Sequence, residues 1–140
     1  PAAAGGELGE FADAVQRRLL ARLQKRARRA ADLDSEALHA LRIAGKRLRY
    51  ALEFLAPLYA PDKLAPRLEE LEALQNGLGR LNDLATLGRL LHPLTATAPV
   101  LREALAEVEA WHRAALAPEL ARLPAVLKQI RQMRPPRRRG

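Results

Sequence analysis

The sequence contains no cysteine and few aromatic residues, since Phe, Trp and Tyr make up only 4% of its 140 residues. The lack of cysteine excludes disulfide bonds and thiolate metal sites. No apolar run reaches the roughly 18 residues that cross a bilayer, and the first residues lack the basic region and apolar core of a signal peptide. These absences predict a soluble, cytoplasmic protein that does not enter a membrane.

Leucine and alanine dominate the hydrophobic residues, which form 49% of the chain. This composition favours an all-α protein, and the length suits one domain. The net charge of +8 is unevenly distributed: residues 1–60 carry +4, residues 61–121 carry −3 and residues 122–140 carry +7. The cationic character therefore lies in the first half and the C-terminal tail, which argues against a uniformly basic surface.

Hydrophobic periodicity and helix-stop residues predict an antiparallel bundle of four long helices. The first helix is expected over about residues 7–29, and the second from just after Asp34 and Ser35, which are good N-cap residues, to between 57 and 61. The third is expected from just after Asp62 to His92–Pro93, and the fourth from about 99 to 132. Pro118 and Pro124 are expected to kink or divide the last helix. Residues 1–6 are predicted to form a flexible leader, residues 7–132 the helical domain, and residues 133–140 a disordered basic tail rich in proline and arginine.

The second expected helix carries a cationic stripe. Its members are spaced at intervals of three, four and three, and they are His39, Arg42, Lys46 and Arg49. Such intervals return to one side of an α-helix. Leucines occupy the opposite side of the same helix. A helix with an apolar back and a continuous cationic front predicts contact with an anionic group.

A second basic stripe lies on the first expected helix, and its members are Arg18, Arg22, Lys25 and Arg29. No acidic residue occurs between Gln16 and Ala31, so neighbours on the same helix do not neutralise this stripe. A single basic stripe is typical of a solvated surface. Two uncompensated stripes on adjacent helices repel each other unless an anion joins them. We therefore expect the stripes to border one groove, where arginine forks bind phosphate oxygens.

The third expected helix contains the segment LEALQNGLGRLNDLATL, in which leucines form an apolar seam beside a polar stripe. Gly79 in that stripe predicts a close approach between helices, because glycine in a helix interior costs about 1 kcal/mol relative to alanine. Asp83 has two readings that the sequence leaves open. It is either the partner that orients an arginine of the second helix or a simple surface acid.

The motifs on the second and third helices resemble those of the CHAD domain, the conserved-histidine α-helical domain. The second helix reads H-x-x-R-x-x-x-K-R-x-R-Y-x-x-E from His39 to Glu53, and the third reads L-Q-x-x-L-G-x-x-N-D from Leu74 to Asp83. The resemblance covers roughly residues 7–117. It implies a helical bundle that binds inorganic polyphosphate in a basic channel, without catalysis and without a cofactor. Phosphate or sulfate is expected to substitute for this ligand.

The same resemblance implies which residues bind. The expected phosphate contacts are Arg18, Arg22, Lys25, Arg29, His39, Arg42, Lys46, Arg47, Arg49 and Tyr50, with Asn82 and Asp83 as orienting residues. CHAD domains contain two four-helix halves, and this chain is similar to one half. Its KRLRY and LGRLND segments resemble those of the second half. The chain is therefore expected to be a fragment or to pair with a second copy, which would rebuild the channel. Polyphosphate granules are an expected location.

Two other functions are weighed against polyphosphate binding. A carboxylate-bridged metal bundle is considered because two Glu-x-x-His pairs occur, Glu36/His39 and Glu109/His112. The two pairs are expected at positions along the bundle that differ by roughly 15 Å, since an α-helix rises 1.5 Å per residue. This separation is too large for both pairs to bind one metal centre. Non-specific nucleic-acid binding is the stronger alternative, because basic stripes attract any phosphate backbone. Surfaces that stack the bases of single strands usually carry several aromatic rings. Tyr50 is the only aromatic residue expected near the stripes, which argues against this kind of binding.

Overall fold

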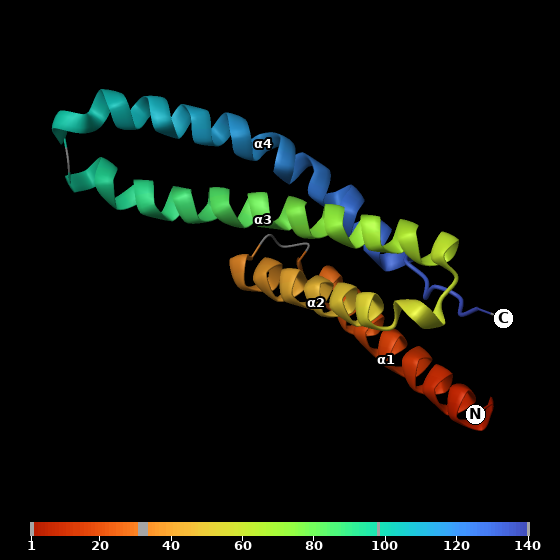
Figure 1. Cartoon of the computed structure of the whole chain (residues 1–140). Helices are drawn as coiled ribbons and strands as arrows, with labels where there is room; N and C mark the ends of the chain where they lie inside the picture. Colours follow the sequence, from red (N-terminus) through yellow and green to blue (C-terminus); the bar gives the residue numbers. More distant parts are fainter. Residues whose placement is uncertain (1, 31–33, 98, 140) are drawn as a thin grey trace.

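The computed structural model describes residues 2–30, 34–97 and 99–139, which form long α-helices joined by short connections (Figure 1). The α-helices are α1 (Ala2–Arg29), α2 (Ser35–Phe54), α3 (Pro61–Thr97) and α4 (Arg102–Gln132). Short 3₁₀ helices, η2 (Ala56–Leu58) and η3 (Pro99–Leu101), lie between α2 and α3 and between α3 and α4. The all-α prediction with four long helices is confirmed.

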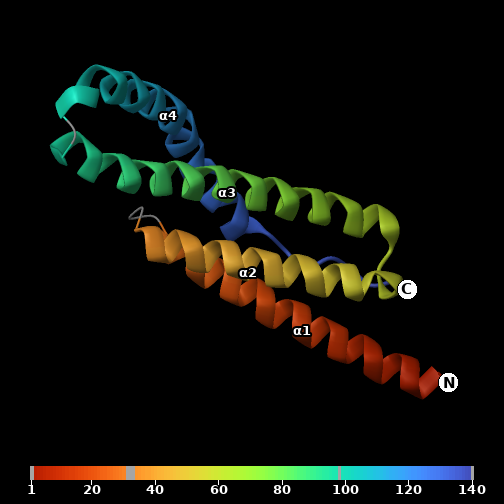
Figure 2. The same ribbon diagram turned by 60° about the vertical axis from the view of Figure 1, so that its left-hand side comes forward.

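The chain forms two antiparallel hairpins, α1–α2 and α3–α4, that pack side by side through α2 and α3 (Figures 1 and 2). The α3–α4 hairpin is longer, and its closed end extends well beyond the α1–α2 hairpin in both views. The N-terminal part of α1 diverges from the other helices at the opposite end. No helix in the described ranges is both long enough and apolar enough to cross a membrane.

Leucine side chains at helical spacing form the core where the hairpins meet. The fully buried side chains with the largest volumes are Tyr59, Leu23, Leu41, Leu48, Leu52, Leu71 and Ile130. They come from α1, α2, α3, α4 and the α2–α3 connection, so one core joins all four helices. Asp34 caps the start of α2, because its side chain accepts a hydrogen bond of 3.3 Å from the backbone N–H of Ala37. This cap is where the sequence predicts it.

The helix boundaries differ from the prediction at two proline-containing places. α3 continues past Pro93 to Thr97, and the hydroxyl of Thr97 donates a 2.9 Å hydrogen bond to the carbonyl of Pro93. α4 continues through Pro118 and Pro124 without division. The rings of Pro118 and Pro124 are exposed, so each proline removes one backbone hydrogen bond of α4 without a steric conflict inside the core.

The two chain ends also differ from the prediction. The expected flexible leader, residues 1–6, is helical from Ala2 onward and forms the first part of α1. The expected disordered tail, residues 133–140, packs against the bundle over its described part. Met133 is buried, and the backbone N–H of Arg139 donates a 3.1 Å hydrogen bond to the carbonyl of Leu58. The prediction considered only charge and proline content, whereas backbone hydrogen bonds hold this segment.

Candidate functional site

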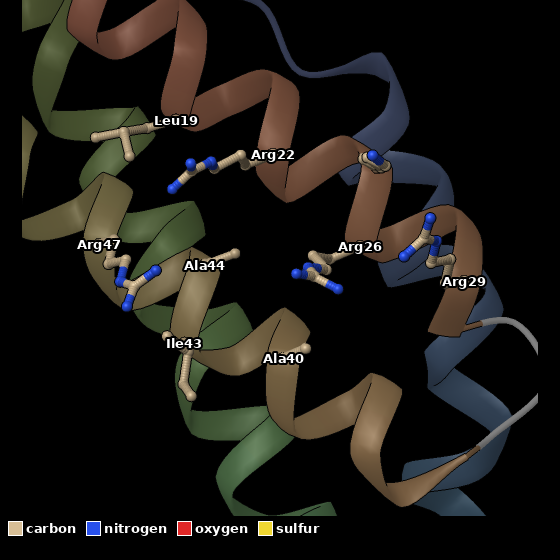
Figure 3. Close-up of a pocket in the computed structure, with 9 residues that line it drawn as sticks. Leu19, Arg22, Arg26, Arg29, Ala40, Ile43, Ala44 and Arg47 are labelled. Atoms are coloured by element: carbon tan, nitrogen blue, oxygen red, sulfur yellow. The ribbon is translucent and has the colours of Figure 1, made fainter.

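A groove of about 500 Å³ lies between α1 and the first half of α2 (Figure 3). Its lining residues are Leu19, Arg22, Lys25, Arg26, Arg29, Ala40, Ile43, Ala44 and Arg47. Ala40 and Ala44 are one turn apart on α2, and their small side chains leave space between the helices. Arg22 of α1 and Arg47 of α2 extend into this space from opposite sides. We call this the α1–α2 groove.

The charge of the α1–α2 groove is uncompensated. Five of its lining residues are cationic, and among the residues that the structure describes none of them forms an ion pair with a carboxylate. Other arginines of the chain are paired: Arg80 lies 3.0 Å from Glu119, and Arg138 lies 2.8 Å from Asp13. The groove therefore gathers positive charge that the described part of the protein does not neutralise, which makes it an electropositive surface.

The stripe on α2 lies on a different side of the helix. The lining of the α1–α2 groove includes neither His39, Arg42, Lys46 nor Arg49. Arg49 instead faces α3, where its guanidinium donates a 3.1 Å hydrogen bond to Gln75, and it pairs with Glu53 of its own helix at 3.0 Å. Arg42 and Arg47 are five residues apart, which places them roughly 140° apart around α2. The expectation that both stripes border one groove is therefore wrong.

Arg42 has an unusual environment. Its residue is half-buried, and its Nε is buried without a hydrogen-bond partner among the described residues. Lys46 is half-buried, whereas His39 and Tyr50 are exposed. The α2 stripe thus forms a second cationic surface, beside α3, in which Gln75 and Glu53 fix one arginine and a buried donor of another lacks an acceptor.

The expected site residues are only partly brought together. Arg22, Lys25, Arg29 and Arg47 line the α1–α2 groove, and Arg18 is exposed outside its lining. Sequence reasoning missed Arg26, although it follows Arg22 by four residues and therefore lies on the same side of α1. It also missed Gln75 as the partner of Arg49, since only the packing of α2 on α3 shows this contact.

Of the two readings of Asp83, its exposure fits that of a surface acid. Asn82 is half-buried, and neither residue forms a hydrogen bond or ion pair with an arginine within the described part of the chain. Gly79 faces open space, because a Cβ built on it meets nothing within 4 Å. The predicted close approach at Gly79 is therefore wrong. It occurs instead at Gly88, where a Cβ would lie 3.1 Å from Cε1 of His112.

The Glu-x-x-His pairs do not form a metal site in the described ranges. No group of three or more His, Asp or Glu side chains there is arranged to hold a metal ion. Glu36 and His39 are exposed on α2, and His112 hydrogen-bonds through Nε2 to the backbone carbonyl of Leu84 on α3. That hydrogen bond joins α3 to α4, so His112 contributes to the α3–α4 contact.

Comparison with known proteins gives the same family as the motifs. The CHAD domain model matches residues 1–92, which include both motif segments. The chain belongs to the CHAD domain family. Its structure is similar to the crystal structure of the CHAD domain from the plant Ricinus communis, with 37% sequence identity and a TM-score of 0.73. A search of curated proteins gave no match.

The match to the Ricinus communis CHAD domain covers 94% of this chain but only 45% of that chain. The four helices described above therefore resemble half of a CHAD domain. Both cationic surfaces of this half, the α1–α2 groove and the α2 stripe, lie within the residues that the family model matches.

Proposed function

We propose that this CHAD half binds inorganic polyphosphate on the cationic surfaces of α1 and α2, without catalysing a reaction. The observation that carries the proposal is the α1–α2 groove, with five cations that have no carboxylate partner among the described residues. A polyanion would supply several countercharges at once and relieve their mutual repulsion. Polyphosphate granules are the location that this ligand implies.

The chemistry of the groove supports phosphate as the recognised group. Four of its five cations are arginines, whose planar guanidinium forks match phosphate oxygens in pairs of hydrogen bonds. The remaining lining residues are Lys, Leu, Ile and Ala. The lining includes no Ser, Thr, Cys, His, Asp or Glu that could act as nucleophile or general base, so the groove supports binding rather than catalysis.

The α2 stripe supports the same ligand from the other side of the helix. Gln75 and Glu53 hold Arg49 in one orientation, which lowers the entropy lost when it binds an anion. The buried Nε of Arg42 lacks an acceptor among the described residues. Lys46 lies between Arg42 and Arg49 in the sequence and adds a third cation. A polyphosphate chain crossing α2 would contact both cationic surfaces.

A second CHAD half is part of this proposal. The chain spans 45% of the Ricinus communis structure, so either a second copy or a covalently linked half would face its cationic surfaces. A twofold pair would place two such surfaces opposite each other. Light scattering of this chain, with and without polyphosphate, measures the state directly. A strictly monomeric species under both conditions would exclude the homodimer.

Calorimetric titration with polyphosphates of defined length tests the function. We expect the groove variant Arg22→Gln/Arg26→Gln to bind on the order of 100-fold more weakly than the unchanged chain, because two charge-assisted contacts are lost. The matched control is Arg102→Gln/Arg113→Gln, which removes the same charge from the exposed distal part of α4. The proposed site fails if the groove variant binds as tightly as the control.

Single-stranded nucleic acid is a second candidate, favoured by one observation. Tyr50 and Phe54 are 55% and 86% exposed and lie one turn apart on α2, close in sequence to Arg47. Exposed aromatic rings beside cations are the elements of a base-stacking surface. Competition distinguishes the two ligands: DNA or RNA of equal charge should not displace long-chain polyphosphate readily at physiological salt. Ready displacement would favour the nucleic-acid function.

A further inference from the structure

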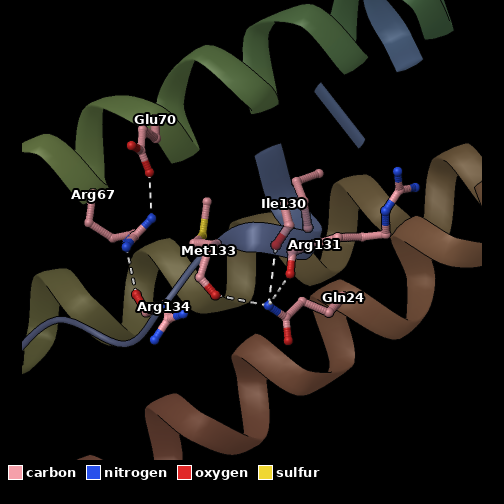
Figure 4. Close-up of polar contacts among 7 residues, drawn as sticks. All are labelled: Gln24, Arg67, Glu70, Ile130, Arg131, Met133 and Arg134. Atoms are coloured by element: carbon pink, nitrogen blue, oxygen red, sulfur yellow. Dashed lines mark hydrogen bonds and ion pairs between the residues drawn. The ribbon is translucent and has the colours of Figure 1, made fainter. Parts of the chain in front are cut away.

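The described part of the C-terminal tail, residues 133–139, runs from the end of α4 along α1 to the α2–α3 connection. We call this segment the strap. Gln24 of α1 donates hydrogen bonds to the carbonyls of Ile130, Arg131 and Met133 at 3.2, 3.4 and 2.9 Å, where α4 ends (Figure 4). The last carbonyls of a helix lack donors within that helix. The carbonyl of Ile130 also accepts a 3.1 Å hydrogen bond from the backbone N–H of Met133. α1 therefore fixes the direction in which the strap leaves α4.

Further contacts hold the strap along its length. Gln16, which is buried, donates a hydrogen bond of 3.3 Å to the carbonyl of Pro136. Arg67 of α3 contacts the carbonyl of Arg134 at 2.6 Å (Figure 4). The guanidinium of Arg139 donates to the carbonyl of Tyr59 at 3.1 Å. Residues from α1, α3 and the α2–α3 connection thus define the path of the strap.

Two residues of α1 position Arg138 of the strap. Its guanidinium pairs with Asp13 at 2.8 Å and lies so close to Gly9 that a Cβ on Gly9 would overlap it. Tyr59, beneath this region, is fully buried. Burial raises the pKa of Tyr59, and the negative charge of Asp13 adds to this shift while Arg138 opposes it. The strap is therefore packed on α1 and on the core.

The strap and α1 together form a second cationic groove, of about 580 Å³. Its lining residues are Asp13, Gln16, Arg17, Arg134, Pro135, Pro136, Arg137, Arg138 and Arg139. Asp13 is the one carboxylate in this lining, and Arg138 is paired with it. Arg17, Arg134 and Arg137 have no carboxylate partner among the described residues. We call this the strap groove.

The strap groove is separate from the α1–α2 groove. The two linings share no residue. Arg17 and Arg22 are five positions apart in α1, which places them roughly 140° apart around the helix. Exposed Arg18 lies between these two sectors of α1. The surface of α1 is thus cationic from one groove to the other.

We propose that the strap groove is a second binding site for phosphate groups, in which Arg17, Arg134 and Arg137 contact the anion. The ordered strap turns three arginines that are far apart in the sequence into one site. A long polyphosphate bound in the α1–α2 groove would continue around α1 into the strap groove. The identity of this ligand as polyphosphate rests on the proposed function, whereas the site itself rests on the geometry of the strap.

Tripolyphosphate and long-chain polyphosphate are the probes for this site. The strap variant Arg134→Gln/Arg137→Gln keeps Arg138, Arg139 and the backbone contacts that hold the strap, so we expect an unchanged melting temperature. Calorimetry should give one tripolyphosphate fewer bound to the strap variant than to the unchanged chain. For long-chain polyphosphate, the variant should bind about tenfold more weakly, with a shallower dependence of affinity on salt.

Two double variants with the same change in charge make the result specific. Arg102→Gln/Arg113→Gln should bind as many tripolyphosphates as the unchanged chain, and the groove variant Arg22→Gln/Arg26→Gln should keep the one in the strap groove. The inference is overturned if the strap variant matches the Arg102/Arg113 control in stoichiometry and affinity. If only the groove variant matches that control, the strap site stands and the proposed role of the α1–α2 groove fails.

Discussion

Arg22 and Arg26 lie one helical turn apart on α1 and both line the α1–α2 groove, so replacing them with glutamine tests the groove through protein stability. The replacement removes four like-charge pairs at spacings of three or four residues, which involve Arg18, Lys25 and Arg29 as well. Each such pair destabilises a helix by about 0.2–0.5 kcal/mol. Glutamine and arginine have similar helix propensities. The free variant should therefore be more stable by about 1 kcal/mol.

Polyphosphate should reverse the order of stability of the two proteins. At a concentration of 100 times its dissociation constant, polyphosphate stabilises the unchanged chain by about 2.7 kcal/mol. If the variant binds about 100-fold more weakly, the same concentration stabilises it by only about 0.4 kcal/mol. The variant, which is about 1 kcal/mol more stable than the unchanged chain without ligand, becomes about 1 kcal/mol less stable than the unchanged chain at this polyphosphate concentration.

Urea unfolding at low salt, with and without polyphosphate, measures both differences from the same linear extrapolation. The advantage of the free variant should shrink as salt is added, because the repulsion lies at the surface and is screened. The Arg102→Gln/Arg113→Gln control should show neither the gain nor the reversal. A groove variant that is less stable when free, or that keeps the full ligand stabilisation, would refute the reasoning.

Three further predictions concern stability and are measured by urea unfolding. Gln24→Leu should cost about 1–2 kcal/mol, because it removes the side-chain donor to the carbonyls of Arg131 and Met133, whereas the carbonyl of Ile130 keeps the backbone N–H of Met133. Tyr59→Phe should not destabilise the protein at pH 7, since the buried hydroxyl has no described partner. Because the pKa of Tyr59 is raised in the folded state, the unfolded chain loses the phenol proton first as the pH rises above about 10. The unchanged chain therefore loses stability from this group above that pH, and the variant does not. Gly79→Ala should gain up to about 1 kcal/mol in open space, whereas Gly88→Ala should gain less because its Cβ presses on His112.

The repeating patterns of the sequence predicted most of the secondary structure. Leucine spacing predicted four helices, and Asp34 predicted the start of α2, because both depend on residues a few positions apart. Prolines were less informative. Pro93 was expected to end the third helix and Pro118 and Pro124 to kink or divide the fourth, yet α3 runs past Pro93 and α4 is not divided. A proline on the exposed side of a packed helix loses one hydrogen bond, and core contacts on the other side outweigh that loss.

The candidate site was predicted best where it depends on a single helix. The stripe on α1 led to Arg22, Lys25 and Arg29, which do share a groove. The stripe on α2 was expected in that groove as well, but α2 packs between α1 and α3, so its two cationic sides face different neighbours. Which side of a helix meets which partner depends on the crossing geometry of helices, and spacing along one helix carries no information about it.

By itself, the sequence determined the helices, the family and the two cationic stripes, because each follows from periodicity or from motifs within short segments. Only the tertiary structure decided that Arg47 joins α1, that Gln75 holds Arg49, and that the C-terminal tail is an ordered strap. Composition predicted disorder for that tail, but Gln16 and Gln24, more than 100 positions away, bind its backbone. Such long-range hydrogen bonds exist only after the core has brought the two ends of the chain together.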